Sequence, residues 1–238
     1  MAKLEIAVIS DIHGYSLALD RVLADIDEHG IEHIIVAGDL VESGPDPMGV
    51  LRRLVDRNLV VIQGNTDYDI AKRNRDSKLA AWTERQVGKA GRQYLLDLPF
   101  EHRVTPPGAD SPWQDLLVVH ANPYDFNSAI RPDADQEALD YLIGKTKAGV
   151  LAFGHIHISY TRDLPNMKLI DVSAVGNPKD GDLRSRWGQI TWDDELLSWS
   201  TAIHHVPYPL EETERQIRKS GIPKPEKRIK RLKEARYT

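Results

Sequence analysis

A run of four apolar residues, Val150 to Phe153, leads directly into Gly154 and then into two histidines, His155 and His157, separated by one residue. Short apolar runs of β-favouring residues predict buried strands, and the glycine marks where this strand stops. If the backbone stays extended beyond the glycine, side chains two residues apart point the same way. We therefore expect both histidines at the end of a strand, ready to hold one metal ion each or a bridged pair. Two unrelated surface histidines would explain an isolated His-x-His equally well, so the rest of the chain decides.

Similar apolar runs recur along the chain between segments that favour helix. They lie at residues 4–9, 34–37, 59–62 and 116–119, and helix-prone segments lie at residues 16–30, 48–57, 68–97 and 136–142. Strands that alternate with helices predict an α/β layered fold. Further strands are expected at residues 100–104, 167–172, 187–192 and 196–206. The strands near the C-terminus predict a second sheet.

Five of these predicted strands end in side chains that can bind a metal ion. They are Asp11 with His13, Asp39, Asn65, His120, and His155 with His157. In α/β sheets the ligand site lies at the carboxyl ends of the strands, where all of these residues fall. Each motif alone is common in turns, but five of them directly after apolar strands indicate a shared metal site. Imidazole, carboxylate and amide oxygen together suit Mn, Fe, Co, Ni or Zn.

The composition excludes several other chemistries. The 238 residues include no cysteine, which rules out disulfides, thiolate zinc sites and cysteine nucleophiles. An apolar content of 41% and a charged content of 28% are typical of a soluble globular protein. No apolar run approaches the roughly 20 residues of a membrane span, and the N-terminus lacks a secretory h-region. We expect a cytoplasmic protein that does not bind membranes.

Charge is distributed unevenly along the chain. Residues 211–238 contain ten Lys and Arg against five Asp and Glu, so residues 1–210 carry a net charge of −10. An acidic body disfavours nucleic-acid binding but suits a carboxylate metal site. The basic tail mixes charges at helical spacing and is broken near Gly221, which favours a helix packed on the body or on a neighbouring subunit. We therefore predict a domain at residues 1–210 followed by a charged tail at 211–238, and homo-oligomerisation stays open.

The order of the motifs resembles the calcineurin-like metallophosphoesterase superfamily. Asp-x-His, Gly-Asp, Gly-Asn, His and Gly-His-x-His follow one another between Asp11 and His157. Residues 98–99, 119–123 and 175–182 resemble the small, single-domain phosphodiesterase-like branch. The resemblance implies a four-layer α/β/β/α sandwich of two mixed β-sheets flanked by helices.

The resemblance also implies a phosphodiesterase or phosphatase with two divalent metal ions, Mn in the first place and Fe, Zn, Co or Ni as alternatives. One ion would be held by Asp11, His13 and His157. The other would be held by Asn65, His120 and His155, with Asp39 bridging both. In the family's mechanism, a metal-bound hydroxide attacks a small phosphorylated substrate in line at phosphorus, which implies catalytic roles for Asp39, Asn65 and His120.

Two positions qualify this assignment. More familiar members of the family carry a histidine after Gly-Asn that assists the leaving group, whereas this chain has Thr66 followed by Asp67. A threonine hydroxyl can donate a hydrogen bond but cannot act as a general acid near neutral pH, which puts poor leaving groups in doubt. Arg184 would either clamp the substrate phosphate or pair with a nearby aspartate, and the sequence favours neither. The histidines outside the motifs are interpreted as surface or strand residues: His29, His33, His102, His204 and His205.

A protein-binding scaffold on the same fold, with a vestigial site, is the alternative function. Such a scaffold is expected to lose metal ligands, and all seven are present here. The enzyme is therefore favoured, although the sequence names neither its physiological substrate nor its native metal.

Overall fold

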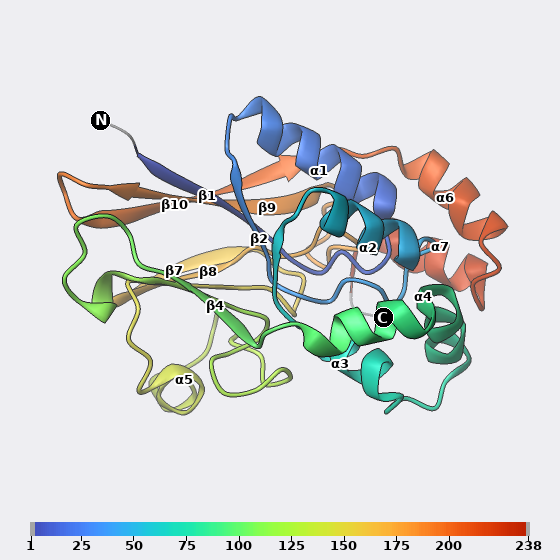
Figure 1. Cartoon of the computed structure of the whole chain (residues 1–238), viewed down its shortest axis with the longest axis horizontal. Helices are drawn as coiled ribbons and strands as arrows, with labels where there is room; N and C mark the ends of the chain where they lie inside the picture. Colours follow the sequence, from blue (N-terminus) through green and yellow to red (C-terminus); the bar gives the residue numbers. More distant parts are fainter. Residues whose placement is uncertain (1–2, 237–238) are drawn as a thin grey trace.

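Two five-stranded β-sheets pack face to face with helices on their outer faces in the computed structural model, which describes residues 3–236 (Figure 1). In spatial order, the first sheet consists of β10 (Ser198–Val206), β9 (Ser185–Asp193), β1 (Leu4–Ile9), β2 (His33–Val36) and β3 (Val60–Val61). The second sheet consists of β4 (Glu101–Val104), β5 (Leu116–Val119), β6 (Val150–Phe153), β8 (Met167–Asp171) and β7 (Tyr160–Leu164). Both sheets are mixed, because β9 runs antiparallel to β1, and β4 and β7 run antiparallel to their neighbours.

Helices cover the outer faces of both sheets. They are α1 (Ser16–Glu28), α2 (Pro47–Asp56), α3 (Asn65–Lys72), α4 (Lys78–Asp97), α5 (Gln136–Ile143), α6 (Leu210–Lys219) and α7 (Pro225–Glu234), with a short 3-10 helix η1 (Pro112–Gln114). Apolar residues of α1, α2, α4, α6 and α7 share one core with the first sheet, and those of α5 pack on the second sheet. The predicted α/β/β/α sandwich is confirmed. No helix among residues 3–236 is long and apolar enough to cross a membrane.

Side chains alternate between layers along the central strands. In β1, Ile6 and Val8 point into the core between the two sheets, whereas Ala7 and Ile9 point into the core beneath α1. The strands β5 and β6 alternate in the same way between the central core and the core beneath α5. Because both faces of β5 and β6 are buried, their sequences are continuously apolar, and in β1 only Glu5, near the start of the strand, interrupts the apolar run.

The strands closest to the C-terminus do not all belong to the second sheet. β8 does, but β9 and β10 return to the first sheet, where β9 pairs with β1 over residues 188–192. The second sheet is built from residues 101–171. The expectation that the C-terminal run forms the second sheet is therefore wrong for its last two strands, because strand pairing across about 180 residues leaves no local sequence signal.

The edge strand β7 was not predicted. It pairs with β8 on one side only, and its side chains alternate between half-buried and exposed. The sequence Tyr-Thr-Arg-Asp-Leu contains two charged residues and no apolar run, so periodicity does not single it out as a strand.

The basic tail forms α6 and α7, which lie beside α1 and α2 beyond one end of the first sheet (Figure 1). Ile217, Ile229 and Leu232 are buried in the same core as the apolar side of α1. The backbone N–H of Gly181 donates to the carbonyl of Ala235 at 2.8 Å, which joins the loop before β9 to the end of α7. Apolar packing therefore holds these helices against the body, and the domain boundary at residue 210 stays a prediction.

Candidate metal centre

The predicted ligands meet at the edge where the parallel strands of both sheets end. By element, they are Asp11 and His13 after β1, Asp39 after β2, Asn65 at the start of α3, His120 after β5, and His155 and His157 after β6. Both sheets contribute, so the cluster lies between them at the carboxyl ends of their strands. This is the place where α/β sheets bind ligands.

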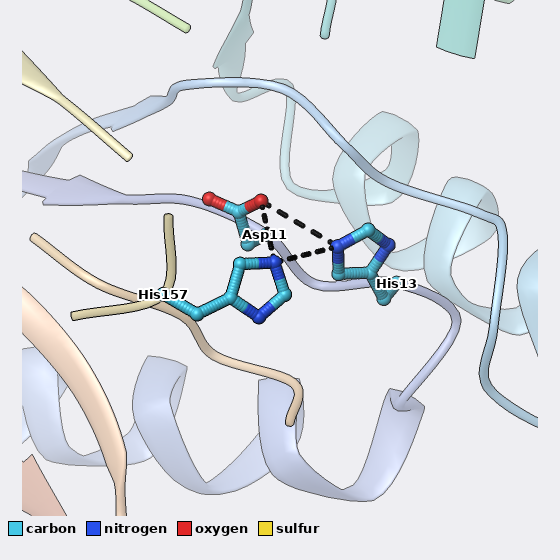
Figure 2. A group of neighbouring side chains, drawn as sticks. All are labelled: Asp11, His13 and His157. Atoms are coloured by element: carbon cyan, nitrogen blue, oxygen red, sulfur yellow. Dashed lines mark hydrogen bonds and ion pairs between the residues drawn. The ribbon is translucent and has the colours of Figure 1, made fainter. Parts of the chain in front are cut away.

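A first group contains Asp11, His13 and His157 (Figure 2). Nε2 of His13 lies 3.0 Å from Nε2 of His157 and 3.5 Å from Oδ1 of Asp11. Nε2 of His157 lies 3.1 Å from the same carboxylate oxygen. All three residues are buried, so three potential metal-binding atoms face one another away from bulk water.

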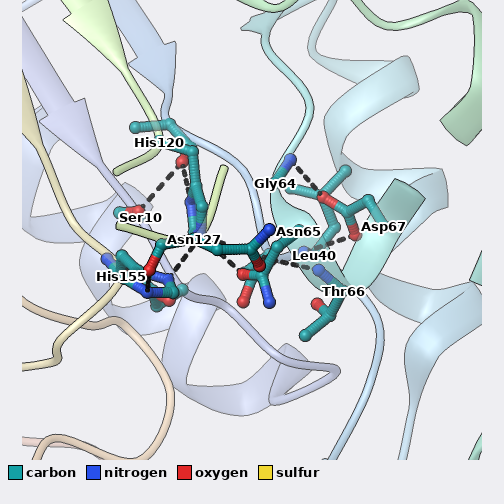
Figure 3. A network of polar contacts seen from close by, with 12 residues as sticks. Ser10, Leu40, Gly64, Asn65, Thr66, Asp67, His120, Asn127 and His155 are labelled. Atoms are coloured by element: carbon teal, nitrogen blue, oxygen red, sulfur yellow. Dashed lines mark hydrogen bonds and ion pairs between the residues drawn. The ribbon is translucent and has the colours of Figure 1, made fainter. Parts of the chain in front are cut away.

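A second group contains Asn65, His120 and His155 (Figure 3). Nε2 of His120 lies 3.0 Å from Oδ1 of Asn65 and 3.2 Å from Nδ1 of His155. These three residues come from two different sheets, and His120 is at their centre.

Asp39 lies between the two groups. Its Oδ2 is 3.6 Å from Nε2 of His13, and its Oδ1 is 3.5 Å from Nε2 of His120. The backbone N–H of Thr66 donates to Oδ1 at 2.9 Å and holds the carboxylate in this orientation. Each oxygen of Asp39 therefore faces one group.

Backbone carbonyls orient three of the four imidazoles. Nδ1 of His13, His120 and His157 each lies 2.8 Å from a carbonyl oxygen. These oxygens belong to Glu42, Ala37 and Asn177 respectively. A carbonyl only accepts hydrogen bonds, so Nδ1 carries the proton and the lone pair of each ring is on Nε2, facing the cluster. Metal-binding histidines are commonly oriented in this way.

His155 is oriented in the opposite sense. Its Nε2 donates to the carbonyl of Asn127 at 3.0 Å, which leaves the lone pair on Nδ1, the atom that faces His120. The cluster thus brings together ring nitrogens, carboxylates and an amide oxygen. Such a set of donors suits a divalent metal cation.

Electrostatics at Asp11 support a cation in this position. Burial raises the pKa of Asp11, but the charge of His157 and the hydrogen bonds of His13 and His157 outweigh it and hold the pKa well below the ordinary value. Burial lowers the pKa of His13, but Asp11 and Asp39 raise it to about 9. Among residues 3–236, Oδ1 of Asp11 has no hydrogen bond of good geometry although it is buried. A buried, ionised carboxylate beside two imidazole nitrogens fits a divalent cation, which would take the place of the imidazole protons.

Five of the seven candidate ligands have a left-handed backbone. Their φ angles are 53° for Asp11, 52° for His13, 56° for Asp39, 74° for His155 and 58° for His157. Such conformations cost of order 1–3 kcal/mol for each residue and cluster at functional sites. The backbone after Gly154 is therefore left-handed rather than extended, so His155 and His157 do not meet the condition under which they would point the same way. Instead, the two histidines face different groups.

Two glycines permit the close approach of these loops. A Cβ on Gly154 would lie 2.6 Å from Cβ of Ser10 and closer still to Oδ2 of Asp11, which accepts the N–H of His155 at 2.8 Å. A Cβ on Gly64 would lie 3.0 Å from Cα of Asp39 and closer still to its backbone N. Neither position has room for a side chain.

Asp67 and Glu42 support the site, and their supporting contacts were not predicted. Asp67 accepts the N–H of Leu40 at 2.9 Å and that of Gly64 at 3.1 Å, which joins the loops that carry Asp39 and Asn65. Burial, followed by the charge of Asp39, raises the pKa of Asp67 to about 7. An acidic residue three positions after Gly64 is the sequence signal of a capping interaction, and it could have identified Asp67.

Glu42 is buried, pairs with Arg75 and provides the carbonyl that holds His13. No sequence signal points to this role of Glu42.

The remaining predicted site residues lie in different environments. Thr66 is buried beside Asn65, and within residues 3–236 its hydroxyl has no hydrogen-bond partner. Arg184 pairs with Asp182, with 2.6 Å between Nη2 and Oδ2, which is the alternative that the sequence left open. Its role as a phosphate clamp stays a prediction. Lys179, which was not predicted, is half-buried, and its backbone N–H donates to the carbonyl of His157 at 2.9 Å.

Comparison with known proteins gives a consistent relationship. A sequence model of the calcineurin-like phosphoesterase superfamily domain matches residues 4–186. The uncharacterised protein MJ0912 of Methanocaldococcus jannaschii is 27% identical over 94% of this chain and 96% of its own length. The phosphodiesterase YfcE of Escherichia coli is 24% identical over 83% and 91% respectively. The crystal structure of a metallophosphoesterase from Sphaerobacter thermophilus has the same fold, with a TM-score of 0.76 and 22% identity over 98% of this chain and 99% of that chain.

Proposed function

The chain belongs to the calcineurin-like phosphoesterase superfamily of hydrolases, and we propose that it hydrolyses a small phosphodiester or phosphomonoester at a dinuclear metal site. One observation carries the proposal. The two oxygens of Asp39 face two separate groups of potential ligands, 3.6 Å from Nε2 of His13 and 3.5 Å from Nε2 of His120. A carboxylate in this position can bind two ions at once.

The donor set fits a pair of divalent cations. One would be held by Asp11, His13 and His157, and the other by Asn65, His120 and His155, with Asp39 shared. Nitrogen and oxygen donors of this kind suit Mn, our first choice, and also Fe, Zn, Co or Ni. When bound, two such ions lower the pKa of a shared water, which makes hydroxide available for in-line attack, and stabilise the attacking and leaving oxygens.

The protein's contribution is to hold these donors in place. Asp39, Asn65 and His120 are the proposed catalytic residues. Nε2 of His120 lies 3.5 Å from Oδ1 of Asp39 and 3.0 Å from Oδ1 of Asn65, so these side chains link the shared carboxylate to the second group of ligands. The carbonyls behind the imidazoles fix the ring orientation, and the N–H of Thr66 fixes the carboxylate of Asp39. Turnover therefore needs little rearrangement of these side chains.

The leaving group receives no proton from a histidine at position 66. The buried hydroxyl of Thr66 can donate one hydrogen bond to an oxygen of the substrate, but it cannot transfer a proton near neutral pH. The leaving oxygen must depart as an anion or take its proton from water. We therefore propose substrates with good leaving groups, such as aryl esters and pyrophosphate-type bonds.

Lys179 is the proposed cationic contact for the substrate. Its backbone is bonded to the carbonyl of His157, and its Nζ donates to Oδ1 of Asn177 at 3.0 Å. Burial lowers the pKa of Lys179, and so does the charge of Arg231. The ammonium group therefore contacts Asn177, the residue whose carbonyl accepts the Nδ1 proton of His157, and a partly desolvated ammonium group so near a proposed ligand suits a phosphate oxygen.

The test is hydrolysis of bis(p-nitrophenyl) phosphate by protein loaded with Mn²⁺. We expect turnover that EDTA abolishes and Mn²⁺ restores. Asp39→Asn should lower kcat/KM by more than about 100-fold, because loss of a group that merely orients a metal ligand already costs about 10–100-fold in activity. Asp163→Asn is the matched control, because Asp163 lies on the exposed edge strand β7 and should leave turnover unchanged. Equal rates for Asp39→Asn and wild type would contradict the proposal, and a loaded wild type without turnover on aryl and pyrophosphate-type substrates would favour the scaffold.

A further inference from the structure

A second cluster of metal-capable side chains lies where the end of α1 meets β10. It contains Asp25, His29 and His204, and one ligand atom of each lies within 4.8 Å of the others. Asp25 is in the last turn of α1 and His29 follows that helix, so the two residues are one helical turn apart and lie on the same face. His204 comes from β10 in the first sheet. None of the three belongs to the motifs that define the phosphoesterase centre.

Hydrogen bonds fix the tautomer of His29. Its Nδ1 donates to the carbonyl of Asp25 at 2.7 Å, so the lone pair of the ring is on Nε2. The side chain of His29 is 38% exposed, which allows an ion to reach it from solvent.

A chain of hydrogen bonds fixes the tautomer of His204. Nε2 of Gln189 donates to Oε1 of Glu5 at 3.0 Å, so the amide presents its oxygen to His204. This oxygen lies 2.9 Å from Nε2 of His204 and accepts its proton, which leaves the lone pair on Nδ1. Histidines that bind metal are characteristically held by such an outer partner.

Trp187 holds two of the three side chains in place. Its ring stacks on that of His204 at 4.0 Å with an interplanar angle of 8°, and its Nε1 donates to Oδ2 of Asp25 at 2.7 Å. His29 meets the ring of His204 edge-on at 4.6 Å. Trp187 itself is fully buried. The cluster is therefore held by a rigid part of the core rather than by mobile surface residues.

The local field favours a cation. The carboxyl end of a helix carries partial negative charge, and Asp25 and His29 lie at that end of α1. The carboxylate of Asp25 lies on the same side, with its Oδ2 3.8 Å from Nδ1 of His29.

We propose that Asp25, His29 and His204 form a second metal site, which binds one Zn²⁺, Ni²⁺ or Cu²⁺ ion independently of the phosphoesterase centre. Two imidazoles and one carboxylate are the donors that these borderline ions prefer, and three protein ligands leave positions for water. The site would connect the end of α1 to β10 and so stabilise the folded chain when an ion is bound.

Tryptophan fluorescence reports on this site directly, because Trp187 contacts both His204 and Asp25. Protein loaded with Mn²⁺ is titrated with Ni²⁺, and we expect saturable quenching by a single equivalent. His29→Gln and His204→Gln should each weaken the apparent affinity by more than about 100-fold, since loss of an outer partner alone costs about 10–100-fold. Gln189→Leu removes the amide oxygen that accepts the proton of His204, and it should weaken the apparent nickel affinity by about 10–100-fold.

Two controls separate this site from other nickel sites. His205→Gln changes the next residue of β10, which contacts Asp182 instead, and should quench as the wild type does. Asp39→Asn impairs the phosphoesterase centre and should also retain quenching, so the two proposals stand or fall separately. Unchanged nickel affinity in both His29→Gln and His204→Gln would overturn the proposal. Loss of quenching in Asp39→Asn would also overturn it, because the quenching ion would then occupy the other centre.

Discussion

Gly154→Ala is the change that most sharply tests how tightly the metal centre is built. A Cβ at this position would lie 2.6 Å from Cβ of Ser10, roughly 1 Å inside the contact distance of about 3.5–4.0 Å between carbon atoms. It would lie closer still to Oγ of Ser10 and Oδ2 of Asp11. The strand end must therefore move away from Asp11, which strains or breaks the 2.8 Å hydrogen bond from the N–H of His155.

The expected cost has two parts. Overpacking of a closed site costs about 1–3 kcal/mol of folding free energy. Displacement of Asp11 and His155 disturbs one ligand of each predicted ion, so Mn²⁺ affinity should fall by at least about 10–100-fold. Urea unfolding measures the first part, and isothermal titration of metal-free protein with Mn²⁺ measures the second.

Gly108→Ala is the matched control. Gly108 has a φ of +76° in an exposed loop, and a Cβ there would meet only Leu197, at an ordinary 3.9 Å. Its cost is backbone strain of about 1–2 kcal/mol, without any effect on the metal centre. Similar losses of stability in both variants, with loss of Mn²⁺ affinity in Gly154→Ala alone, would support the account. Wild-type Mn²⁺ affinity in Gly154→Ala would refute it.

Two further outcomes are expected. Thr66→His restores a proton donor beside Asp67, so it should raise kcat/KM by up to about 10²–10⁴-fold for alkyl leaving groups and least for aryl ones. The measurement is kcat/KM over a series of leaving groups, and a flat dependence in the wild type would show that another residue supplies the proton. Leu232→Ala in α7 should cost about 2–5 kcal/mol of unfolding free energy in urea denaturation, because Leu232 is buried with α1 in one core. The control Lys230→Ala changes an exposed residue of the same helix and should stay within about 0.5 kcal/mol, and equal effects of both changes would mean that charge alone holds the tail.

The sequence predicted what local pattern can encode. The strands β1, β5 and β6 were found at their observed bounds, because burial on both faces makes them apolar runs, which Glu5 alone interrupts. The candidate ligands were found because each directly follows such a run. The family and the four-layer fold followed from the order of the motifs.

Other features depend on contacts that no local pattern encodes. The pairing of β9 with β1 and the meeting of His29 with His204 join residues more than 170 positions apart. Gly154 packs closely on Asp11, and the backbone at His155 and His157 is left-handed. The extended backbone that would have pointed both histidines the same way is therefore not formed. Because neither belongs to a motif, His29 was interpreted as a surface residue and His204 as a strand residue, and their proximity was not predicted.

If Asp39 is shared by two metal ions, one ion should lie on each side of its carboxylate. Anomalous diffraction from crystals grown with Mn²⁺, measured near the manganese absorption edge, locates these ions. We expect two peaks flanking Asp39, one beside Asp11, His13 and His157 and the other beside Asn65, His120 and His155. A single peak, or two peaks of which neither contacts Asp39, would contradict the sharing of Asp39.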